Sequence, residues 1–256
     1  MSVQAALVTG SSRGIGLATA LELARAGFNI AINSRQKGDV LNSAASAVEK
    51  CGVKVCSVAM DVRELARRRD EFDRIENEIG PLTTLVNNAG IGVISRGDVL
   101  NATEESYDRC MDVNAKAVFF LCQEFARRLL SRQQDPDLKY SLINVTSSNA
   151  VAVALPRGEY CASKAAAAMI SKVFAARLGE HGIPVFDVQP GLISTDMTSA
   201  VIEDYSRRAA EGLCLYPRVG QPEEVAGVIA AIATGRIPYT TGQSISVDGG
   251  MLVPRF

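Results

Sequence analysis

The chain has no tryptophan, a single histidine and six cysteines in 256 residues. Because His181 is the only imidazole, zinc sites built from several histidines are excluded, and a serine hydrolase would have to use that residue as its base. His181 precedes Gly182 at an expected helix end, where a structural role is typical. The cysteines show neither a C-x-x-C pair nor metal-ligand spacing, so we expect buried free thiols and no metal site.

Charge of either sign is not in excess, since 27 Lys and Arg face 28 Asp and Glu. This balance argues against binding of nucleic acid or of anionic membranes through bulk charge. No apolar run approaches the roughly 20 residues of a membrane helix, and the first eight residues lack the basic and apolar regions of a signal peptide. We therefore expect a cytoplasmic protein that binds neither nucleic acid nor membrane.

Short apolar runs alternate with longer helical patterns along the whole chain. Strands are expected at residues 5–9, 29–33, 54–59, 84–87, 141–145, 184–188 and 244–247. Helices are expected at residues 14–26, 40–51, 64–78, 104–132, 159–180 and 223–234. The strand runs are almost continuously apolar, which is typical of strands covered on both faces. The pattern predicts an α/β protein, a single-domain Rossmann fold over residues 1–256 with a doubly wound parallel sheet of about seven strands and helices on both faces.

A glycine-rich turn, Thr9-Gly10-Ser11-Ser12-Arg13-Gly14-Ile15-Gly16, joins the first expected strand to the first expected helix. A dinucleotide pyrophosphate needs close backbone approach and the free N–H groups of a helix N-terminus, and glycines lack the Cβ atoms that would block it. The spacing is G-x-x-x-G-x-G, and the alternative is a plain strand–helix connection. Its place after an opening apolar strand favours dinucleotide binding.

The end of the second expected strand distinguishes NAD from NADP. It reads Asn33-Ser34-Arg35-Gln36-Lys37, without the acidic residue that would bind the ribose hydroxyls of NAD. Arg35 can pair with a 2′-phosphate in a bidentate manner, and Arg13 lies in the nearby loop. The alternative is that Arg35 and Lys37 are solvated loop charges. We expect NADP as cofactor, with NAD as the alternative.

One long stretch, residues 191–220, has little regular pattern and follows an expected strand end. Ligands bind beyond such ends in open α/β sheets, and long loops in compact domains are usually functional. We interpret this stretch as a substrate lid that contains a short helix.

Three further segments follow the glycine-rich loop in order, namely Asn87-Asn88-Ala89-Gly90, Tyr160-Cys161-Ala162-Ser163-Lys164 and Pro190-Gly191. Together they make nearly the whole chain resemble the short-chain dehydrogenase/reductase family. This resemblance implies an oxidoreductase that moves a hydride between a nicotinamide coenzyme and a carbonyl or alcohol.

The residue chemistry agrees with this resemblance. Tyr160 and Lys164 lie one helical turn apart, on one face. An ammonium nearby lowers the pKa of a phenol, which is about 10 when free. The resemblance implies that Tyr160 is the general acid and base and that Lys164 also holds the nicotinamide ribose. The resemblance also implies a serine thirteen residues before the tyrosine, which is Ser147; it would hydrogen-bond the substrate carbonyl, and Ser148 is adjacent.

Other roles are implied only by the resemblance. Asn114 would bend a helix and hold a water linked to Lys164, or it bends the helix without a chemical role. The coenzyme would contact Gly10, Ser12, Arg13, Gly14, Ile15, Gly16, Ser34, Arg35, Asp61, Val62, Asn88, Ala89, Gly90, Tyr160, Lys164, Pro190, Gly191, Ile193 and Thr195.

The substrate is less well defined by the sequence. The resemblance is greatest to 3-oxoacyl-[acyl-carrier-protein] reductases, and dehydrogenases of sugars, polyols and small alcohols share the same motifs. A remote alternative is a cofactor-sensing binding protein without turnover. Four basic residues allow two interpretations, a patch that binds an acidic carrier protein or a solvated face: Arg127, Arg128, Arg132 and Lys172.

Two more expectations concern surfaces. Arg157 and Glu159 precede or flank Tyr160, and we expect them at an exposed helix start, with contact to substrate as the alternative. The family resemblance also implies a homo-oligomer, a tetramer or dimer formed through the long helices at 104–132 and 159–180.

Overall fold

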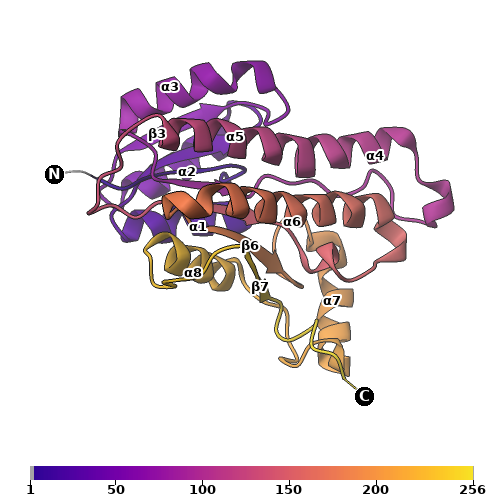
Figure 1. Ribbon diagram of the computed structural model, residues 1–256. Helices are drawn as coiled ribbons and strands as arrows, with labels where there is room; N and C mark the ends of the chain where they lie inside the picture. Colours follow the sequence, from indigo (N-terminus) through magenta and orange to yellow (C-terminus); the bar gives the residue numbers. More distant parts are fainter. Residues whose placement is uncertain (1–2, 256) are drawn as a thin grey trace.

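A computed structural model describes residues 3–255 of the chain. A parallel sheet of seven strands runs through its centre in the order β3-β2-β1-β4-β5-β6-β7 (Figure 1). The strands are β1 (Ala5–Val8), β2 (Asn29–Ser34), β3 (Val55–Ala59), β4 (Thr84–Asn87), β5 (Ser141–Val145), β6 (Val185–Pro190) and β7 (Gln243–Val247). The predicted Rossmann class and strand number are confirmed.

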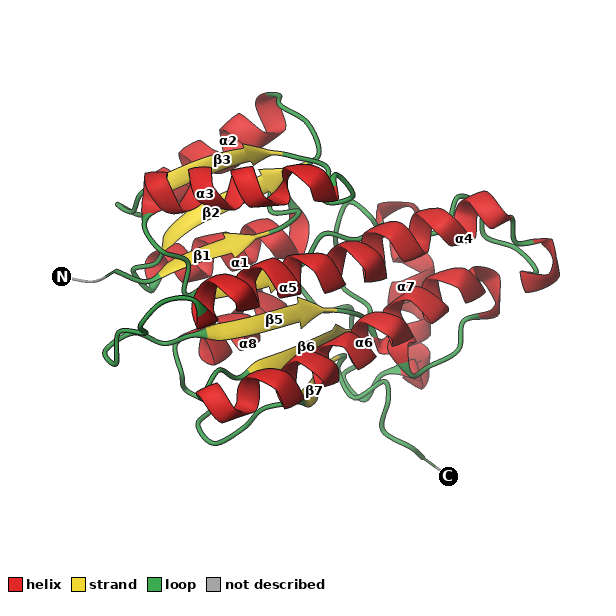
Figure 2. Cartoon of the chain, turned by 45° about the horizontal axis from the view of Figure 1, so that its top comes forward, coloured by secondary structure: helices red, strands yellow, loops and turns green. Residues whose placement is uncertain are grey.

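Helices cover both faces of the sheet. One face carries α1 (Gly14–Arg25), α2 (Asp39–Glu49) and α8 (Pro222–Ala233). The other carries α3 (Arg68–Ile79), α5 (Ala117–Leu130) and α6 (Gly158–Leu178), which lie in front of the strands in Figure 2. Within β1, Ala5 and Leu7 face the second layer while Ala6 and Val8 face the first. Alternate residues therefore enter different cores, which explains why the strand sequences are apolar throughout.

The helix predicted at residues 104–132 is interrupted. It consists of α4 (Glu104–Met111), a π-helical turn (Asp112–Lys116) and α5. A π turn widens a helix locally by one residue and occurs often at functional sites. Here it contains Asn114, whose side chain is bound by groups outside the helix. The strand predicted at residues 184–188 continues as far as Pro190, because its pairing with β7 extends to Val247.

The carboxyl ends of the strands form the edge where this fold places its ligands. The loops after β1 and β4 leave this edge side by side, at the point where strand order reverses. Beyond β6, residues 191–220 contain α7 (Ile202–Arg208) and a small apolar cluster that includes Leu192 and Tyr205. The two ends of this segment meet in a bridge between Ile193 and Gly220.

All six cysteines are free, and burial raises the pKa of the Cys122 thiol to about 12. Buried free thiols were expected, and four of the six are buried, whereas Cys51 and Cys161 are half-buried. Over residues 3–255, no helix combines the length and the apolar character needed to cross a membrane.

Candidate active site

The loop after β1 forms a tight cradle at the start of α1. The Gly10 amide donates to Asn33 Oδ1 at 3.1 Å, and Asn88 Nδ2 donates to the carbonyls of Thr9 and Gly10 at 3.0 and 3.1 Å. A Cβ atom on Gly16 would lie 2.3 Å from the Gly10 carbonyl oxygen. The cradle therefore depends on the missing side chain, and it brings backbone N–H groups to the helix N-terminus. These features fit the pyrophosphate of a dinucleotide.

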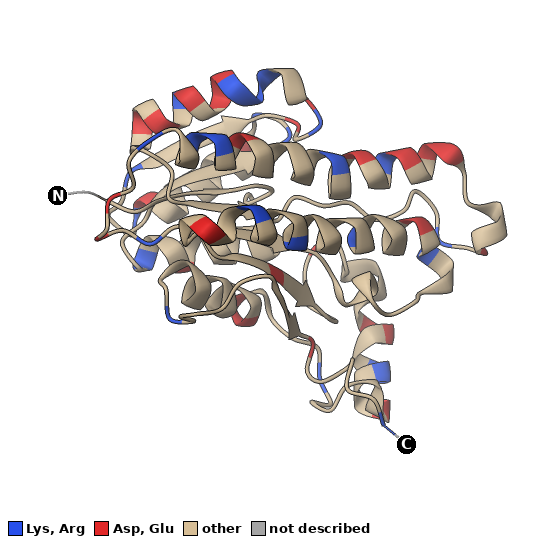
Figure 3. Ribbon diagram, in the orientation of Figure 1, with Lys and Arg blue, Asp and Glu red and all other residues tan. Residues whose placement is uncertain are grey.

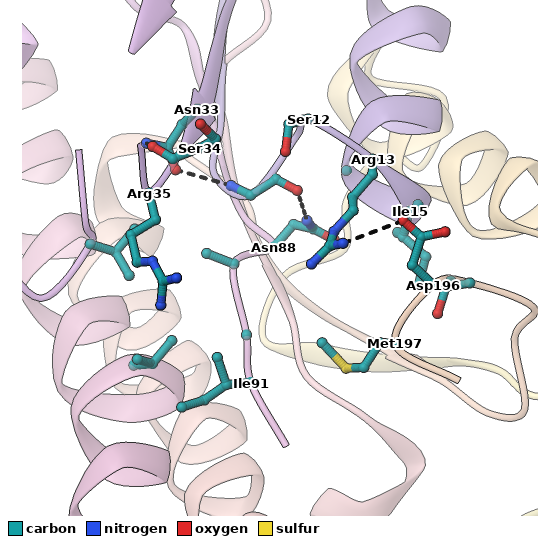
Figure 4. A pocket seen from close by; sticks show the side chains of 18 of the residues that line it. Ser12, Arg13, Ile15, Asn33, Ser34, Arg35, Asn88, Ile91, Asp196 and Met197 are labelled. Carbon is teal, nitrogen blue, oxygen red and sulfur yellow. Dashed lines mark hydrogen bonds and ion pairs between the residues drawn. The ribbon is translucent and has the colours of Figure 1, made fainter. Parts of the chain in front are cut away.

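A single cavity of about 870 Å³ continues from this cradle along the carboxyl edge of the sheet. Its lining contains every residue predicted to contact the coenzyme, and it also contains Ser147. Figure 4 shows the part of the lining around Arg13, Arg35 and Asn88. Ser148 is not in the lining, so of the two adjacent serines the structure places Ser147 in the cavity. Asn114 lies outside the lining as well. The volume is typical of cofactor sites.

The end of β2 supplies the basic part of the cavity. Arg35 lies in the lining together with Ser34, whose hydroxyl donates to the Gln36 carbonyl. Arg13 lies apart from Arg35 and forms an ion pair at 3.5 Å with Asp196 (Figure 4). Asp196 belongs to residues 191–220, which we interpreted as a lid and call the lid segment. The two arginines predicted near a 2′-phosphate are thus not brought together. Of these two arginines, Arg13 has a carboxylate partner, whereas Arg35 forms no ion pair among residues 3–255.

Asp61 lies in the lining, and its carboxylate is held by Arg63 at 2.8 Å. Hydrogen bonds from Arg63 outweigh burial and lower the pKa of Asp61 below its ordinary value. Asp61 is therefore an ionised acceptor in the part of the cavity that follows β2 and β3.

The predicted catalytic residues meet at the other end of the cavity. Tyr160 and Lys164 lie on α6, and Ser147 follows β5. Lys164 Nζ donates to the Val145 carbonyl at 3.1 Å and lies 5.8 Å from the centre of the Tyr160 ring. The Ser147 oxygen accepts a hydrogen bond from the Asn149 amide at 3.1 Å, which leaves its own proton for another acceptor.

Asn114 stands behind these residues and holds the loop after β4. Its Oδ1 accepts from the Ile91 amide at 2.9 Å, and its Nδ2 donates to the Ile91 carbonyl and to Ser163 Oγ, both at 3.0 Å. A Cβ atom on Gly90 would lie 3.3 Å from both Asn114 Oδ1 and Lys164 Nζ. Asn114 therefore positions the Gly90–Ile91 backbone against Lys164. Its predicted water-binding role stays a prediction.

Burial is the largest influence on the pKa values of Tyr160 and Lys164. Burial raises the pKa of Tyr160, although hydrogen bonding to Ser147 and the charge of Arg157 partly oppose this rise. Burial also lowers the pKa of Lys164 to about 8, although the charge of Asp187 opposes this fall. The causes that lower the pKa of Tyr160 here are the hydrogen bond to Ser147 and the charge of Arg157. The predicted effect of Lys164 on Tyr160 stays a prediction.

Several site residues were not found from the sequence. Asn33 fixes Gly10 across 23 residues of chain. Asp187 is buried in β6, where its carboxylate accepts hydrogen bonds from Thr146, Gln189 and Ser244. Glu159, expected in solvent, is only 7% exposed and accepts from Ser106 Oγ at 2.7 Å. It is buried because α4 packs against the start of α6.

The glycine-rich loop also has the G-x-S-x-G spacing of a hydrolase turn, at Gly10, Ser12 and Gly14. His181, however, lies at the far end of α6 from Tyr160, where it contacts Arg177 and Glu180. Its place just before β6 is at the opposite edge of the sheet from the cavity. Ser12 thus has no imidazole base, and hydrolysis by a triad is excluded.

Comparisons with known proteins show the family of this chain. A sequence profile of the family described as "Enoyl-(Acyl carrier protein) reductase" matches residues 10–252. A 3-oxoacyl-[acyl-carrier-protein] reductase of Staphylococcus epidermidis is 32% identical over 97% of this chain and 98% of its own. This chain belongs to the short-chain dehydrogenase/reductase family. It is an NAD(P)-dependent oxidoreductase.

Two other members of the short-chain dehydrogenase/reductase family show how broad the similarity is. A gluconate 5-dehydrogenase of Gluconobacter oxydans is 33% identical over 97% of this chain and 94% of its own. A crystal structure of a Brucella melitensis 3-oxoacyl-[acyl-carrier protein] reductase in complex with NAD aligns over 100% of both chains, with a TM-score of 0.96 and 32% identity. Relatives with different substrates are thus equally similar, and the substrate has to be inferred from the site.

Asp187 gives this short-chain dehydrogenase/reductase a testable pH dependence. Its negative charge holds the pKa of Lys164 near 8 against burial, so Lys164 loses its proton as the pH rises through that value. Asp187→Asn removes the charge and lowers the pKa of Lys164 further. The alkaline fall of the carbonyl reduction rate should then move to lower pH, as measured by the pH dependence of kcat.

The control for this prediction is Glu211→Gln, which removes an exposed acid from the lid segment. We expect its pH profile to match that of the parent protein. The opposite result would be an Asp187→Asn protein that is slower at every pH but whose rate falls at the same alkaline pH as that of the parent. Asp187 would then support the fold and leave the pKa of Lys164 unaffected.

Proposed function

We propose that this enzyme is an NADP(H)-dependent reductase of ketones, or a dehydrogenase of the corresponding alcohols. One observation carries the proposal: Ser147, Tyr160 and Lys164 lie at one end of the cavity whose other end presents Arg35. The cofactor would lie along the glycine cradle between these ends. When bound, it would supply or accept the hydride, which is chemistry that no side chain can perform.

The chain's own residues would manage the oxygen of the substrate. Because burial raises the pKa of Tyr160, the phenol keeps its proton at neutral pH and can donate it to a carbonyl oxygen during reduction. Ser147 can donate a hydrogen bond to the same oxygen as negative charge develops there. Lys164, fixed by the Val145 carbonyl, places an ammonium beside the reacting groups.

Preference for NADP(H) is proposed from the charge at the end of β2. The family relationship does not decide it, because the Brucella melitensis relative was crystallised with NAD. Arg35→Ser should raise the KM for NADPH roughly tenfold or more, since a charge-assisted hydrogen bond contributes about 1.5–3 kcal/mol. The KM for NADH should change little. Steady-state kinetics with both coenzymes measure this effect.

Arg25→Ser is the matched control, because Arg25 is an exposed residue of α1 that pairs with Glu22. Its coenzyme preference should equal that of the parent protein. If Arg35→Ser weakens NADPH and NADH equally, Arg35 does not bind a 2′-phosphate.

Two substrate classes fit the proposed reaction, 3-oxoacyl thioesters and ketones derived from sugars, polyols or small alcohols. The loop between β5 and α6 exposes Val151, Val153 and Leu155, which suits a substrate with an apolar part. A basic docking patch for a carrier protein has less support. Arg128 and Arg132 are tied to Glu76 at 3.0 and 2.7 Å, so these charges are neutralised within the chain.

Figure 3 shows basic and acidic residues side by side along α3, the helix that carries Glu76. Because the basic residues are paired with acids, nothing here requires a carrier protein. We therefore propose that 3-oxoacyl thioesters would be accepted either free or bound to a carrier. The purified protein should oxidise NADPH in the presence of a ketone panel that includes an acetoacetyl thioester and keto sugars, as followed by nicotinamide absorbance. Coenzyme binding without turnover of any of these substrates would support a cofactor-sensing protein instead.

We also propose a homo-oligomer, a tetramer or dimer, formed through α5 and α6. Met169 and Val173 are 58% and 50% exposed on α6, which is unusual for large apolar side chains on a long helix. Sedimentation velocity tests the proposal, and a monomer at micromolar concentration would contradict it.

A further inference from the structure

Two arginines from different parts of the chain converge on one phenol next to the catalytic tyrosine. Arg157 Nη1, at the start of α6, lies 3.3 Å from the Tyr205 hydroxyl, and Arg96 Nη2, in the loop after β4, lies 3.4 Å from the same oxygen. Tyr205 belongs to α7 of the lid segment and is 4% exposed. Three separate segments therefore bring two positive charges to one oxygen atom.

These arginines have an unusual set of partners. Among residues 3–255, neither Arg96 nor Arg157 forms an ion pair with a carboxylate. By contrast, Arg207 on the same lid helix pairs with both Asp204 and Glu211. Each guanidinium has five N–H donors, and contacts of 3.3–3.4 Å to a shared neutral phenol are long for hydrogen bonds. Most of their capacity to bind an anion is thus unused within the chain.

One of the two arginines, Arg157, lies beside the proposed proton donor. The Arg157 guanidinium carbon is 5.6 Å from the centre of the Tyr160 ring, on its face. Tyr160 is the residue that would donate a proton to the substrate oxygen. An anion bound by Arg157 would accordingly stand within a few bonds of the carbonyl that is reduced.

We propose that Arg157 and Arg96 form an oxyanion-binding subsite and that the substrate is a small ketone, or its alcohol, that carries a carboxylate or phosphate near the reacting carbon. This inference rests on the proposed function and narrows its substrate classes. It favours keto acids and related sugar acids over neutral 3-oxoacyl thioesters.

Two physical arguments support an anion at this place. Bringing two like charges onto one phenol is unfavourable unless a negative charge joins them, and a carboxylate or phosphate can accept two parallel N–H donors from each guanidinium. The positive charge also affects the Tyr205 phenol. Burial raises the pKa of Tyr205, but hydrogen bonding to Arg96 and the charge of Arg157 outweigh the effect of burial and lower this pKa below its ordinary value.

The test compares keto acids with their methyl esters, which have the same carbon skeleton but no charge. The parent protein should prefer each acid in kcat/KM, and Arg157→Met should reduce the acid-to-ester ratio roughly tenfold to a hundredfold, the range expected for hydrogen bonds to a charged group. Arg96→Gln, on an exposed loop, should reduce the ratio in the same direction. Keto phosphates measured beside the keto acids distinguish the two anions. Arg207→Gln is the control, and it should keep the parent ratio.

A binding measurement separates this proposal from the proposed function. Calorimetry with the matching hydroxy acid and its ester, in the presence of NADPH, should show that the acid binds more tightly to the parent protein and that Arg157→Met removes this difference. Preference for the acid without any turnover would overturn the proposed reaction but keep the subsite. Equal binding of acid and ester, or an unchanged ratio in Arg157→Met, would overturn the subsite and leave the arginines as a clasp for α7.

Discussion

Tyr160→Phe should lower the rate of carbonyl reduction by about 100- to 10,000-fold, the usual contribution of a general acid in position. This corresponds to about 2.7–5.4 kcal/mol of transition-state stabilisation. The substitution deletes only the hydroxyl, and the raised pKa of Tyr160 means that this hydroxyl carries a proton at neutral pH. Pre-steady-state measurement of NADPH oxidation gives the chemical step directly.

Two controls make the result specific. Tyr107→Phe removes the same atom from an exposed residue outside the cavity, and its rate should equal that of the parent protein. Coenzyme affinity and melting temperature of Tyr160→Phe should stay close to the parent values, because the ring and its packing remain. A rate within threefold of the parent would show that another group donates the proton, and the proposed chemistry would then be wrong.

Most of the fold could be predicted because its signals are local. Strands covered on both faces are apolar throughout, and β1 and β2 were located within one residue for this reason. The π-helical turn at Asp112–Lys116 could not be predicted, since its cause is tertiary. Asn114 is bound by Ile91 and Ser163, which lie 23 and 49 residues away in the chain.

The same distinction applies to the site. Ser147, Tyr160 and Lys164 were predicted from the family resemblance, whose motif lies within a short stretch of chain, and the structure brings all three to one cavity. Arg157 was predicted to be solvated, because its partner Tyr205 lies 48 residues further on, in a segment whose path no sequence pattern defines. Asp187 was missed because a lone acid in an apolar strand has no motif, although an acid in a run such as Val-Phe-Asp-Val is itself a signal of a buried, hydrogen-bonded carboxylate.

Gly16→Ala should abolish coenzyme binding at ordinary concentrations and destabilise the protein. The new Cβ atom would lie 2.3 Å from the Gly10 carbonyl oxygen, 2.5 Å from Asn88 Nδ2 and 2.8 Å from Ser11 Cα. Two of these three neighbours are backbone atoms of the cradle, so the loop itself has to move. Overpacking of this kind costs about 1–3 kcal/mol, and the moved loop no longer presents its N–H groups to a pyrophosphate.

Gly227→Ala is a control that should change stability in the opposite direction. Gly227 lies inside α8 with no atom within 4 Å of an added Cβ. Alanine is favoured over glycine in a helix by about 0.5–1 kcal/mol, so Gly227→Ala should stabilise the protein. Gly16 is also helical, and helix propensity alone would predict the same gain there. Thermal unfolding and coenzyme titration of both variants therefore separate helix propensity from overpacking of the loop. A Gly16→Ala protein that is more stable than the parent and still binds NADPH would show that the dinucleotide does not depend on close backbone approach at this loop.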